Sequence, residues 1–259
     1  MLNRKINVTI YNENLHETTV EEVRAIYPNG IHGALKGFLE KDSAIGTIRC
    51  ATLVDHQQIL TQETLDDTDV LIWWGHMCHH KVEDAVVDIV VKRVLNGMGF
   101  IALHSGHASK PFGRLMGTET HLLRWREAGE KARLWNIATN HPITQGLEQT
   151  FVVPHDETYG EPFGIPEPDQ LIFITWFQGG EVFRSGATWQ RGEGKIFYLQ
   201  NGHETFPVYH QKEIQLVITN AVKWVCPVQR ACTPDRGPGN VAPLEQYTLE
   251  EGSFTPITR

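Results

Sequence analysis

The hydrophobic positions of this chain fall into short apolar runs separated by amphipathic stretches. The run VLIWWG at residues 70–75 has no polar alternation, which is typical of a parallel β-strand buried on both faces. Other short runs, rich in β-branched or aromatic residues, predict strands over residues 5–13, 45–54, 99–103 and 195–200. The pattern therefore predicts several strands, with at least one in the centre of a sheet.

Apolar residues spaced three and four positions apart predict helices between these strands. The clearest stretches are residues 82–94, which end before Gly97, and residues 213–225. Residues 18–27 and 30–39 show helical spacing as well. Strands and helices alternate over the first 117 residues, and their crossovers are expected to be right-handed. This alternation predicts a mostly parallel sheet with helices on both sides.

The pattern changes between residues 125 and 189, where short strands alternate with Pro and Gly turns. This change predicts an antiparallel extension of the sheet. A chain of 259 residues is long enough for one large α/β domain, which we place at residues 1–227. Residues 228–259 are rich in Pro, Gly and charge and predict an extended tail. Such a tail covers its own surface or reaches a neighbouring subunit, so a homo-oligomer is expected.

Charge and composition exclude several classes of partner. The net charge is −8, from 23 Lys and Arg against 31 Asp and Glu, and no basic cluster marks a nucleic-acid site. No apolar run reaches the length of a membrane span, and the first residues show no secretory signal. The cysteines have no CxxC spacing (Cys50, Cys78, Cys226 and Cys232). We therefore expect a cytoplasmic protein that binds neither nucleic acid nor membrane.

Histidine is the unusual component of this chain, because eight of its thirteen histidines lie between His76 and His155. Three imidazoles directly follow predicted strands: His76, His104 and His203. Ligands bind outside the carboxyl ends of parallel strands, so we expect these side chains to converge. Three imidazoles with an open fourth position form a catalytic zinc site. The sequence therefore predicts zinc, or another divalent transition metal, held by these three residues.

Other polar residues near the strand ends have candidate roles in catalysis. His79 or His107 could replace one of the metal ligands, and His107 is also a candidate acid–base residue. Glu157 and Glu204 supply carboxylates that can orient an imidazole or act as a general base. Ser105 follows a strand, as in a nucleophile elbow, although the G-x-S-x-G pattern is absent.

Residues that bind a substrate are expected beside these groups. Gly75 permits a tight turn at a strand end, and His79 lies just beyond it. Tyr159 and Trp176 belong to the later part of the chain, where exposed aromatic rings often stack on sugar faces. No Gly-rich phosphate loop is present, which argues against a nucleotide cofactor. We therefore take these four residues as candidates for binding a small-molecule sugar.

These segments together resemble the trehalose-utilisation family called ThuA. The likeness is carried, in order, by DVLIWWGHMCHH, GMGFIALHSGHASKPF, GRLMGTETHLLRWRE, NHPITQGLE, DETYGEPFGIP and WFQGGEVFRSGATWQRGEGKIFYLQNGHETFP. It covers roughly residues 5–226 and leaves the tail outside. The resemblance implies a fold similar to the class I glutamine amidotransferases. That fold is a flavodoxin-like three-layer α/β sandwich with a mostly parallel central sheet and an antiparallel extension.

The resemblance also implies a function in sugar metabolism. The amidotransferases carry a cysteine nucleophile at the elbow where this chain has His104 and Ser105, so glutamine hydrolysis is excluded. The ThuA family is associated with trehalose and related disaccharides, including their 3-keto derivatives. A zinc ion at the strand ends would polarise such a ketone while Glu157 or Glu204 removes the neighbouring proton. Proton removal leads to isomerisation or to elimination, and the sequence does not choose between them.

Two other functions fit the same residues. A non-catalytic sugar-binding or regulatory protein could have kept an amidotransferase-like pocket after losing its cysteine. A metal-free hydrolase could use Ser105 with His203. The three hypotheses differ in whether the protein needs a metal and whether it turns over a sugar.

Overall fold

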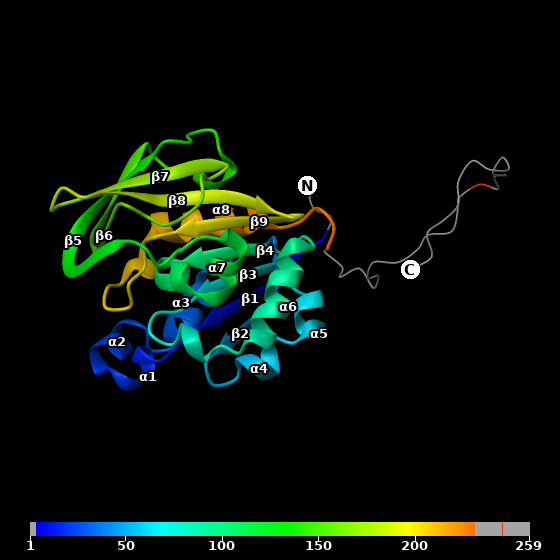
Figure 1. Cartoon of the computed structure of the whole chain (residues 1–259). Helices are drawn as coiled ribbons and strands as arrows, with labels where there is room; N and C mark the ends of the chain where they lie inside the picture. Colours follow the sequence, from blue (N-terminus) through cyan, green and yellow to red (C-terminus); the bar gives the residue numbers. More distant parts are fainter. Residues whose placement is uncertain (1–3, 231–244, 246–259) are drawn as a thin grey trace.

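The computed structural model describes residues 4–230 and residue 245. In this part of the chain all nine strands join one mixed sheet, in the order β2-β1-β3-β4-β9-β8-β7-β5-β6 (Figure 1). The parallel half consists of β1 (Ile6–Asn12), β2 (Ile45–Thr52), β3 (Val70–Trp74), β4 (Gly99–Leu103) and β9 (Gly194–Leu199). The antiparallel half consists of β5 (Arg124–Asn136), β6 (Thr150–Gly160), β7 (Gln170–Phe177) and β8 (Val182–Arg191). The chain is therefore an α/β protein with a large mixed sheet, as the sequence predicts.

The centre of the parallel half is buried on both faces. Every residue of β3 and β4 is buried, in agreement with their uninterrupted apolar runs. The two strands pair in parallel, with Val70 beside Gly99 and Trp74 beside Leu103. Both strands end at the same level, so the loops that follow them meet at one edge of the sheet.

Helices cover the parallel half from both sides (Figure 1). α3 (Gly30–Leu39) packs against α8 (Lys212–Val225), and α6 (Asp84–Leu95) packs between α5 (Gln62–Asp66) and α7 (Lys110–Met116). α8 buries the apolar stripe that its sequence shows: Ile214, Val217, Ile218, Ala221, Val222 and Val225. These helices close the core and leave the carboxyl edge of the strands to the connecting loops.

The prediction of one helix over residues 18–27 is wrong. The structure has two short helices in this region, α1 (His16–Thr19) and α2 (Glu21–Ile26). Val20 between them is extended, with φ −116° and ψ 119°, and this conformation ends the first helix. The helical spacing of the sequence does not show this break.

A buried carboxylate accounts for the position of α1. Glu17 accepts hydrogen bonds from Asn12 Nδ2 at 2.7 Å and from the backbone N–H of Ile31 at 3.1 Å. A buried charge is stable only when such donors surround it, so these bonds hold α1 against the end of β1. His16, the first residue of α1, is thereby placed at the carboxyl edge of the sheet.

The antiparallel half bends toward the same edge. β6 is the outer strand of the sheet, yet the ring of Tyr159 on β6 stacks on His104, which follows β4, with ring centroids 5.1 Å apart. Register shifts between β5 and β6 near Glu130 accompany this bend, as bulged pairs do in curved sheets. The end of β6 is therefore one wall of the region where the parallel strands end.

The amino ends of the parallel strands lie at the opposite edge. There Asp69 accepts hydrogen bonds from Arg4 at 2.6 Å and from Arg230 at 3.1 Å. The rest of the predicted tail, residues 231–244 and 246–259, lies outside the described residues, so the extended tail and the homo-oligomer stay predictions. Within residues 4–230 and residue 245, no helix has the length and apolar character that crossing a bilayer requires.

Candidate active site

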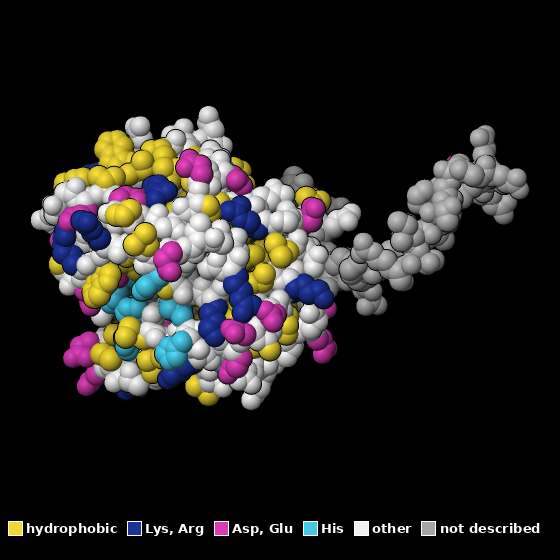
Figure 2. All heavy atoms as spheres, in the orientation of Figure 1, with side chains coloured by type: hydrophobic (Ala, Val, Ile, Leu, Met, Phe, Trp, Pro, Cys, Tyr) yellow, Lys and Arg dark blue, Asp and Glu magenta, His cyan; other side chains and the backbone are white. Residues whose placement is uncertain are grey.

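The histidines that follow β3, β4 and β9 lie together at the carboxyl edge of the sheet. The ring centroid of His203 is 5.1 Å from that of His76 and 5.2 Å from that of His104. Figure 2 shows histidine side chains gathered on one face of the molecule, with hydrophobic side chains beside them. His203 therefore lies between the other two predicted metal ligands.

His104 occupies a sharp turn directly after β4. Its φ of 51° is in the left-handed region, which is unusual for a residue other than glycine and is typical of functional sites. The ring is fully buried, and its Nδ1 lies 2.6 Å from the carbonyl oxygen of Gln200. A carbonyl oxygen can only accept, so Nδ1 donates and the lone pair of the neutral ring is on Nε2.

A buried carboxylate faces that nitrogen. Glu157 Oε2 lies 3.0 Å from His104 Nε2. A neutral imidazole and an ionised carboxylate would place lone pairs against each other here, so a proton or a metal cation must lie between them. Burial by itself would lower the pKa of His104, but the hydrogen bond and charge of Glu157, together with the charge of Asp156 and the Gln200 carbonyl, raise it. The site therefore attracts positive charge to this point.

His203 completes this group from the loop after β9. Its Nε2 lies 3.9 Å from Glu157 Oε2, and the ligating atoms of His104, Glu157 and His203 all lie within 4.8 Å of one another. We call these three residues the buried set. At His203 Nδ1 the Thr205 hydroxyl lies 2.8 Å away and donates in turn to Glu127, while the backbone N–H of Thr205 approaches the same nitrogen at 3.3 Å. The shorter contact places the proton on Nδ1, so Nε2 of His203, like that of His104, offers a lone pair to the shared space.

A second group of three residues adjoins the first. Glu204 Oε1 accepts hydrogen bonds from His16 Nδ1 at 2.5 Å and from His76 Nδ1 at 2.7 Å. We call His16, His76 and Glu204 the outer set, because both of its imidazoles are partly exposed whereas the buried set is enclosed. The structure thus assigns His76 to a different group from the other two predicted ligands.

The hydrogen bonds to Glu204 shift two pKa values in the outer set, those of Glu204 and His16. Burial alone would raise the pKa of Glu204, but the bonds from His16 and His76 outweigh it and hold that pKa well below its usual range. The hydrogen bond between His16 and Glu204 also raises the pKa of His16. Glu204 Oε2 is buried without a hydrogen-bond partner among the described residues and lies 3.6 Å from His203 Nε2. Glu204 is therefore an ionised carboxylate whose Oε1 is bonded within the outer set and whose Oε2 lies toward His203 of the buried set.

Two buried acids hold the loops that carry these histidines. Glu13, directly after β1, accepts hydrogen bonds from the backbone N–H groups of His76, Met77 and Cys78 at 2.8–3.0 Å. Asp156 accepts from Asn201 Nδ2 at 2.8 Å and from the backbone N–H of His203 at 3.4 Å, in the loop that carries His203. Both acids stabilise loop backbones that have no partners in the sheet.

The other predicted histidines lie outside both sets. His107 is buried, donates Nδ1–H to the Thr120 carbonyl at 2.9 Å, and contacts Tyr159 edge-on with ring centroids 5.6 Å apart. Burial lowers its pKa well below the ordinary range. Burial also lowers the pKa of His79 to about 4. Both rings are therefore neutral near pH 7 and act as walls beside the two sets.

The remaining predicted site residues are divided between the site and its surroundings. Tyr159 stacks on His104, and its hydroxyl lies 3.5 Å from His104 Nε2. A Cβ on Gly75 would lie 3.0 Å from the His79 ring, so this glycine gives the ring room. Ser105 Oγ donates to the Gly75 carbonyl at 2.7 Å. Trp176 lies on β7, opposite Arg133 and Val182, and in the described part of the chain no hydrogen bond or ring contact joins it to either set.

Sequence reasoning missed His16 and Glu13. Sites lie at the carboxyl ends of parallel strands, and this rule holds for β1, which ends at Asn12, as it does for β3, β4 and β9. The polar segment after that strand was the available signal. Only the packing of α1 shows that His16 reaches Glu204, 188 positions away in the sequence.

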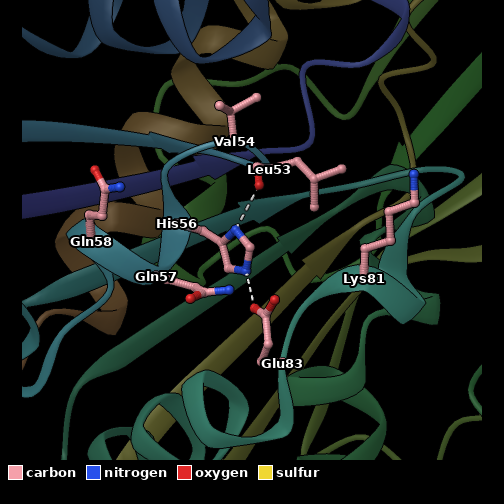
Figure 3. A pocket seen from close by; sticks show the side chains of 7 residues that line it. All are labelled: Leu53, Val54, His56, Gln57, Gln58, Lys81 and Glu83. Atoms are coloured by element: carbon pink, nitrogen blue, oxygen red, sulfur yellow. Dashed lines mark hydrogen bonds and ion pairs between the residues drawn. The ribbon is translucent and has the colours of Figure 1, made fainter.

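A cavity of about 290 Å³ lies beside α4 (His56–Ile59), away from both sets (Figure 3). Its central contact is an ion pair between His56 Nε2 and Glu83 Oε2 at 2.5 Å, and the other ring nitrogen contacts the Leu53 carbonyl. Glu83 accepts from His56 as Glu204 accepts from His16 and His76. The His56–Glu83 pair is therefore a glutamate–histidine contact of the same kind as those in the outer set, but it lies outside the candidate site.

The loop after β9 depends on a glycine, and we expect Gly202→Ala to disrupt it. Gly202 has φ 135°, and a Cβ there would lie 2.0 Å from Tyr209 Oη. Strain and overlap together should lower the free energy of unfolding by about 3 kcal/mol or more. The matched control is Gly117→Ala, where φ is 69° and no atom lies within 4 Å, so the loss should be about 1 kcal/mol. Equal losses in denaturant unfolding would contradict the role of Gly202.

The fold and the two sets define an α/β protein whose candidate site lies where the parallel strands of a large mixed sheet end. The model of the ThuA family, described as trehalose utilisation, matches residues 7–225. This chain belongs to the ThuA family. Among curated proteins no sequence matches this chain.

Solved structures from several bacteria share the fold. A ThuA-like protein from Parabacteroides merdae has a TM-score of 0.65 at 14% identity, covering 91% of this chain and 94% of that chain. A ThuA-like protein from Bacteroides uniformis has a TM-score of 0.61 at 18% identity, with coverage of 87% and 93%. A cytoplasmic protein from Salmonella typhimurium has a TM-score of 0.59 at 12% identity, with coverage of 85% and 100%. At these identities the likeness shows the fold alone.

Proposed function

We propose that this protein is a metal-dependent enzyme that acts on a keto derivative of a trehalose-type disaccharide by removing a proton beside the ketone. The observation that supports this most is the buried set, where two imidazoles and a carboxylate converge away from water. The family description supports a sugar as substrate. We place this activity in the cytoplasm, as the sequence predicts.

The donor atoms of the buried set suit a divalent transition metal. Two histidines and a glutamate are a ligand set of catalytic zinc sites. His104 and His203 each donate Nδ1–H to an oxygen and direct Nε2 inward, which is how second-shell partners orient metal ligands. We therefore propose that His104, Glu157 and His203 hold zinc or a similar ion. When bound, the ion would supply Lewis-acid polarisation of a carbonyl oxygen.

The outer set suits proton transfer. His76 donates Nδ1–H to ionised Glu204, so its Nε2 carries the lone pair of a general base, as in a carboxylate–histidine pair of a catalytic triad. His16 binds the same carboxylate oxygen and has a raised pKa, which favours its protonated form. We propose His76 as the base and His16 as the acid, with Glu204 positioning both.

A 3-keto disaccharide gives these residues a coherent sequence of steps. His76 takes the proton from carbon 2, next to the ketone, and the electron pair of that bond moves toward the ketone. The pair then expels the glycosidic oxygen from carbon 1, and His16 supplies the proton that this oxygen needs. If the proton returns to the sugar carbon instead, the result is isomerisation or epimerisation.

Exchange of hydrogen for deuterium tests the proposal directly. Full-length protein supplied with zinc should remove the carbon-2 proton of 3-keto-trehalose in D₂O, seen as loss of its proton NMR signal, with or without release of glucose. Trehalose itself lacks the ketone and should remain unchanged. If the protein, at a concentration equal to that of the 3-keto-trehalose, causes neither exchange of the carbon-2 proton nor release of product, the proposed reaction is wrong.

A second candidate is a non-catalytic sugar-binding protein, which the altered elbow favours. His104 and Ser105 stand where the amidotransferases carry cysteine, and the Ser105 hydroxyl is engaged by the Gly75 carbonyl. That bond also argues against a serine hydrolase. The non-catalytic function is supported if sugar raises the melting temperature through binding while the NMR experiment shows no exchange.

The strand order supports a finer description of the fold. The parallel strands follow the order β2-β1-β3-β4, with β9 in the fifth place. This corresponds to the flavodoxin-like doubly wound order. We therefore propose the flavodoxin-like, amidotransferase-like sandwich for the parallel half of the sheet.

A further inference from the structure

Trp125, on β5, is the cross-strand partner of the tyrosine that stacks on the buried set. It pairs directly with Tyr159 across the antiparallel strands β5 and β6. Residues directly opposite in such a pair place their side chains on the same face, about 5 Å apart at Cβ. Tyr159 stacks on His104, so the side chain of Trp125 is on the site's face of this ribbon.

The Trp125 side chain is 67% exposed, although tryptophan is ordinarily among the more buried residue types. Trp73, Trp74 and Trp189 in this chain follow that rule, at 1% exposed each. Among residues 4–230 and residue 245, the indole of Trp125 makes no hydrogen bond and no ring contact. Its indole face is therefore free to contact a bound molecule.

The strand beneath Trp125 is held in place. The next residue, Arg126, faces the opposite side and donates to Glu130 at 2.7 Å and to Glu181 at 2.6 Å. These contacts tie β5 to the turn before β8. The indole is thus presented from an anchored backbone, which lowers the entropy cost of using it for binding.

We propose that Trp125 is the surface on which the non-reacting sugar ring of a disaccharide stacks, so that the site selects disaccharides over monosaccharides. This inference rests on the proposed function, which puts the reacting ring at the buried set. A pyranose ring has a face of C–H groups that matches an indole, while its hydroxyls remain in water. The single tryptophan is flanked by the exposed Arg124 and Glu127, which suits a polar ligand better than an apolar protein surface.

The test is calorimetric titration of the full-length protein with trehalose, maltose and glucose. Trp125→Ala should weaken binding of the two disaccharides about tenfold, the loss of one good stacking contact, and should leave glucose within about twofold. Trp125→Phe keeps a smaller aromatic face and should lose about threefold or less. The matched control is Trp135→Ala, another partly exposed tryptophan on β5, which should not change sugar binding.

Each outcome has a defined meaning. Unchanged disaccharide binding by Trp125→Ala overturns this inference while the proposed function stands. A wild-type protein that binds glucose as tightly as trehalose does the same. A wild-type protein that binds none of the three sugars also overturns the inference, and the exchange experiment on 3-keto-trehalose then decides the proposed function separately. If Trp125→Ala unfolds early, Trp125→Phe still tests the inference. The phenylalanine variant should bind disaccharides better than any variant without an aromatic ring at this position.

Discussion

Replacing His104 by alanine should remove both the bound metal and the activity of this protein. His104 supplies the most enclosed of the proposed ligand atoms, and Glu157 would then face His203 alone. We expect elemental analysis of untagged protein to fall from about one equivalent of metal to less than about a tenth. Proton exchange on 3-keto-trehalose should fall by about a thousandfold or more, because Lewis-acid polarisation contributes several kcal/mol.

The control for this prediction is His80→Ala. His80 is exposed in the loop after β3 and belongs to neither set, so its loss should change neither metal content nor rate. Chelator treatment of the wild type should reproduce the His104→Ala rate, and added zinc should restore only the wild type. If His104→Ala retains a full equivalent of metal, the assignment of the buried set is wrong.

Glu204→Gln should reduce the rate while leaving the metal in place. The amide keeps the size of the side chain but removes the charge that orients His16 and His76. We expect kcat to fall by about a hundredfold to ten-thousandfold, the usual contribution of general acid–base groups. The pKa of His16 is raised chiefly by its bond to Glu204, so in the variant it should fall toward the ordinary range of histidine, as measured by NMR.

The matched control is Glu83→Gln, which alters a glutamate–histidine pair of the same kind beside α4. That variant should keep the wild-type rate and the raised pKa of His16. Loss of metal from Glu204→Gln would move Glu204 into the ligand group and contradict the division into two sets. An unchanged kcat would show that the outer set takes no part in proton transfer.

The parallel half of the fold was predictable because its signals are local. β3 and β4 are short uninterrupted apolar runs, and α8 repeats apolar residues at helical spacing, so burial of each element can be inferred without its neighbours. The break at Val20 was not predictable in this way. The helix that ends there is held by Glu17, whose partners Asn12 and Ile31 come from other elements.

The candidate site, like the fold, was predictable from the sequence only where its signals are local. His104 and His203 could be singled out because the strand-end rule needs only a strand and the residue that follows it. Their grouping with Glu157 depends on the bend of β6 across the sheet, which follows from register shifts that leave no pattern in the sequence. The role of Trp125 likewise becomes visible only through its pairing with Tyr159.

By itself the sequence determined the α/β class, the order of most elements and the strand ends at which histidines occur, because hydrophobic periodicity reports the burial of each segment on its own. The tertiary structure alone decided that His76 pairs with Glu204 and His16 while His104 and His203 share Glu157. The physical reason is that a buried charge is stabilised by whichever partners the fold brings within hydrogen-bond distance, and those partners come from segments far apart in the chain.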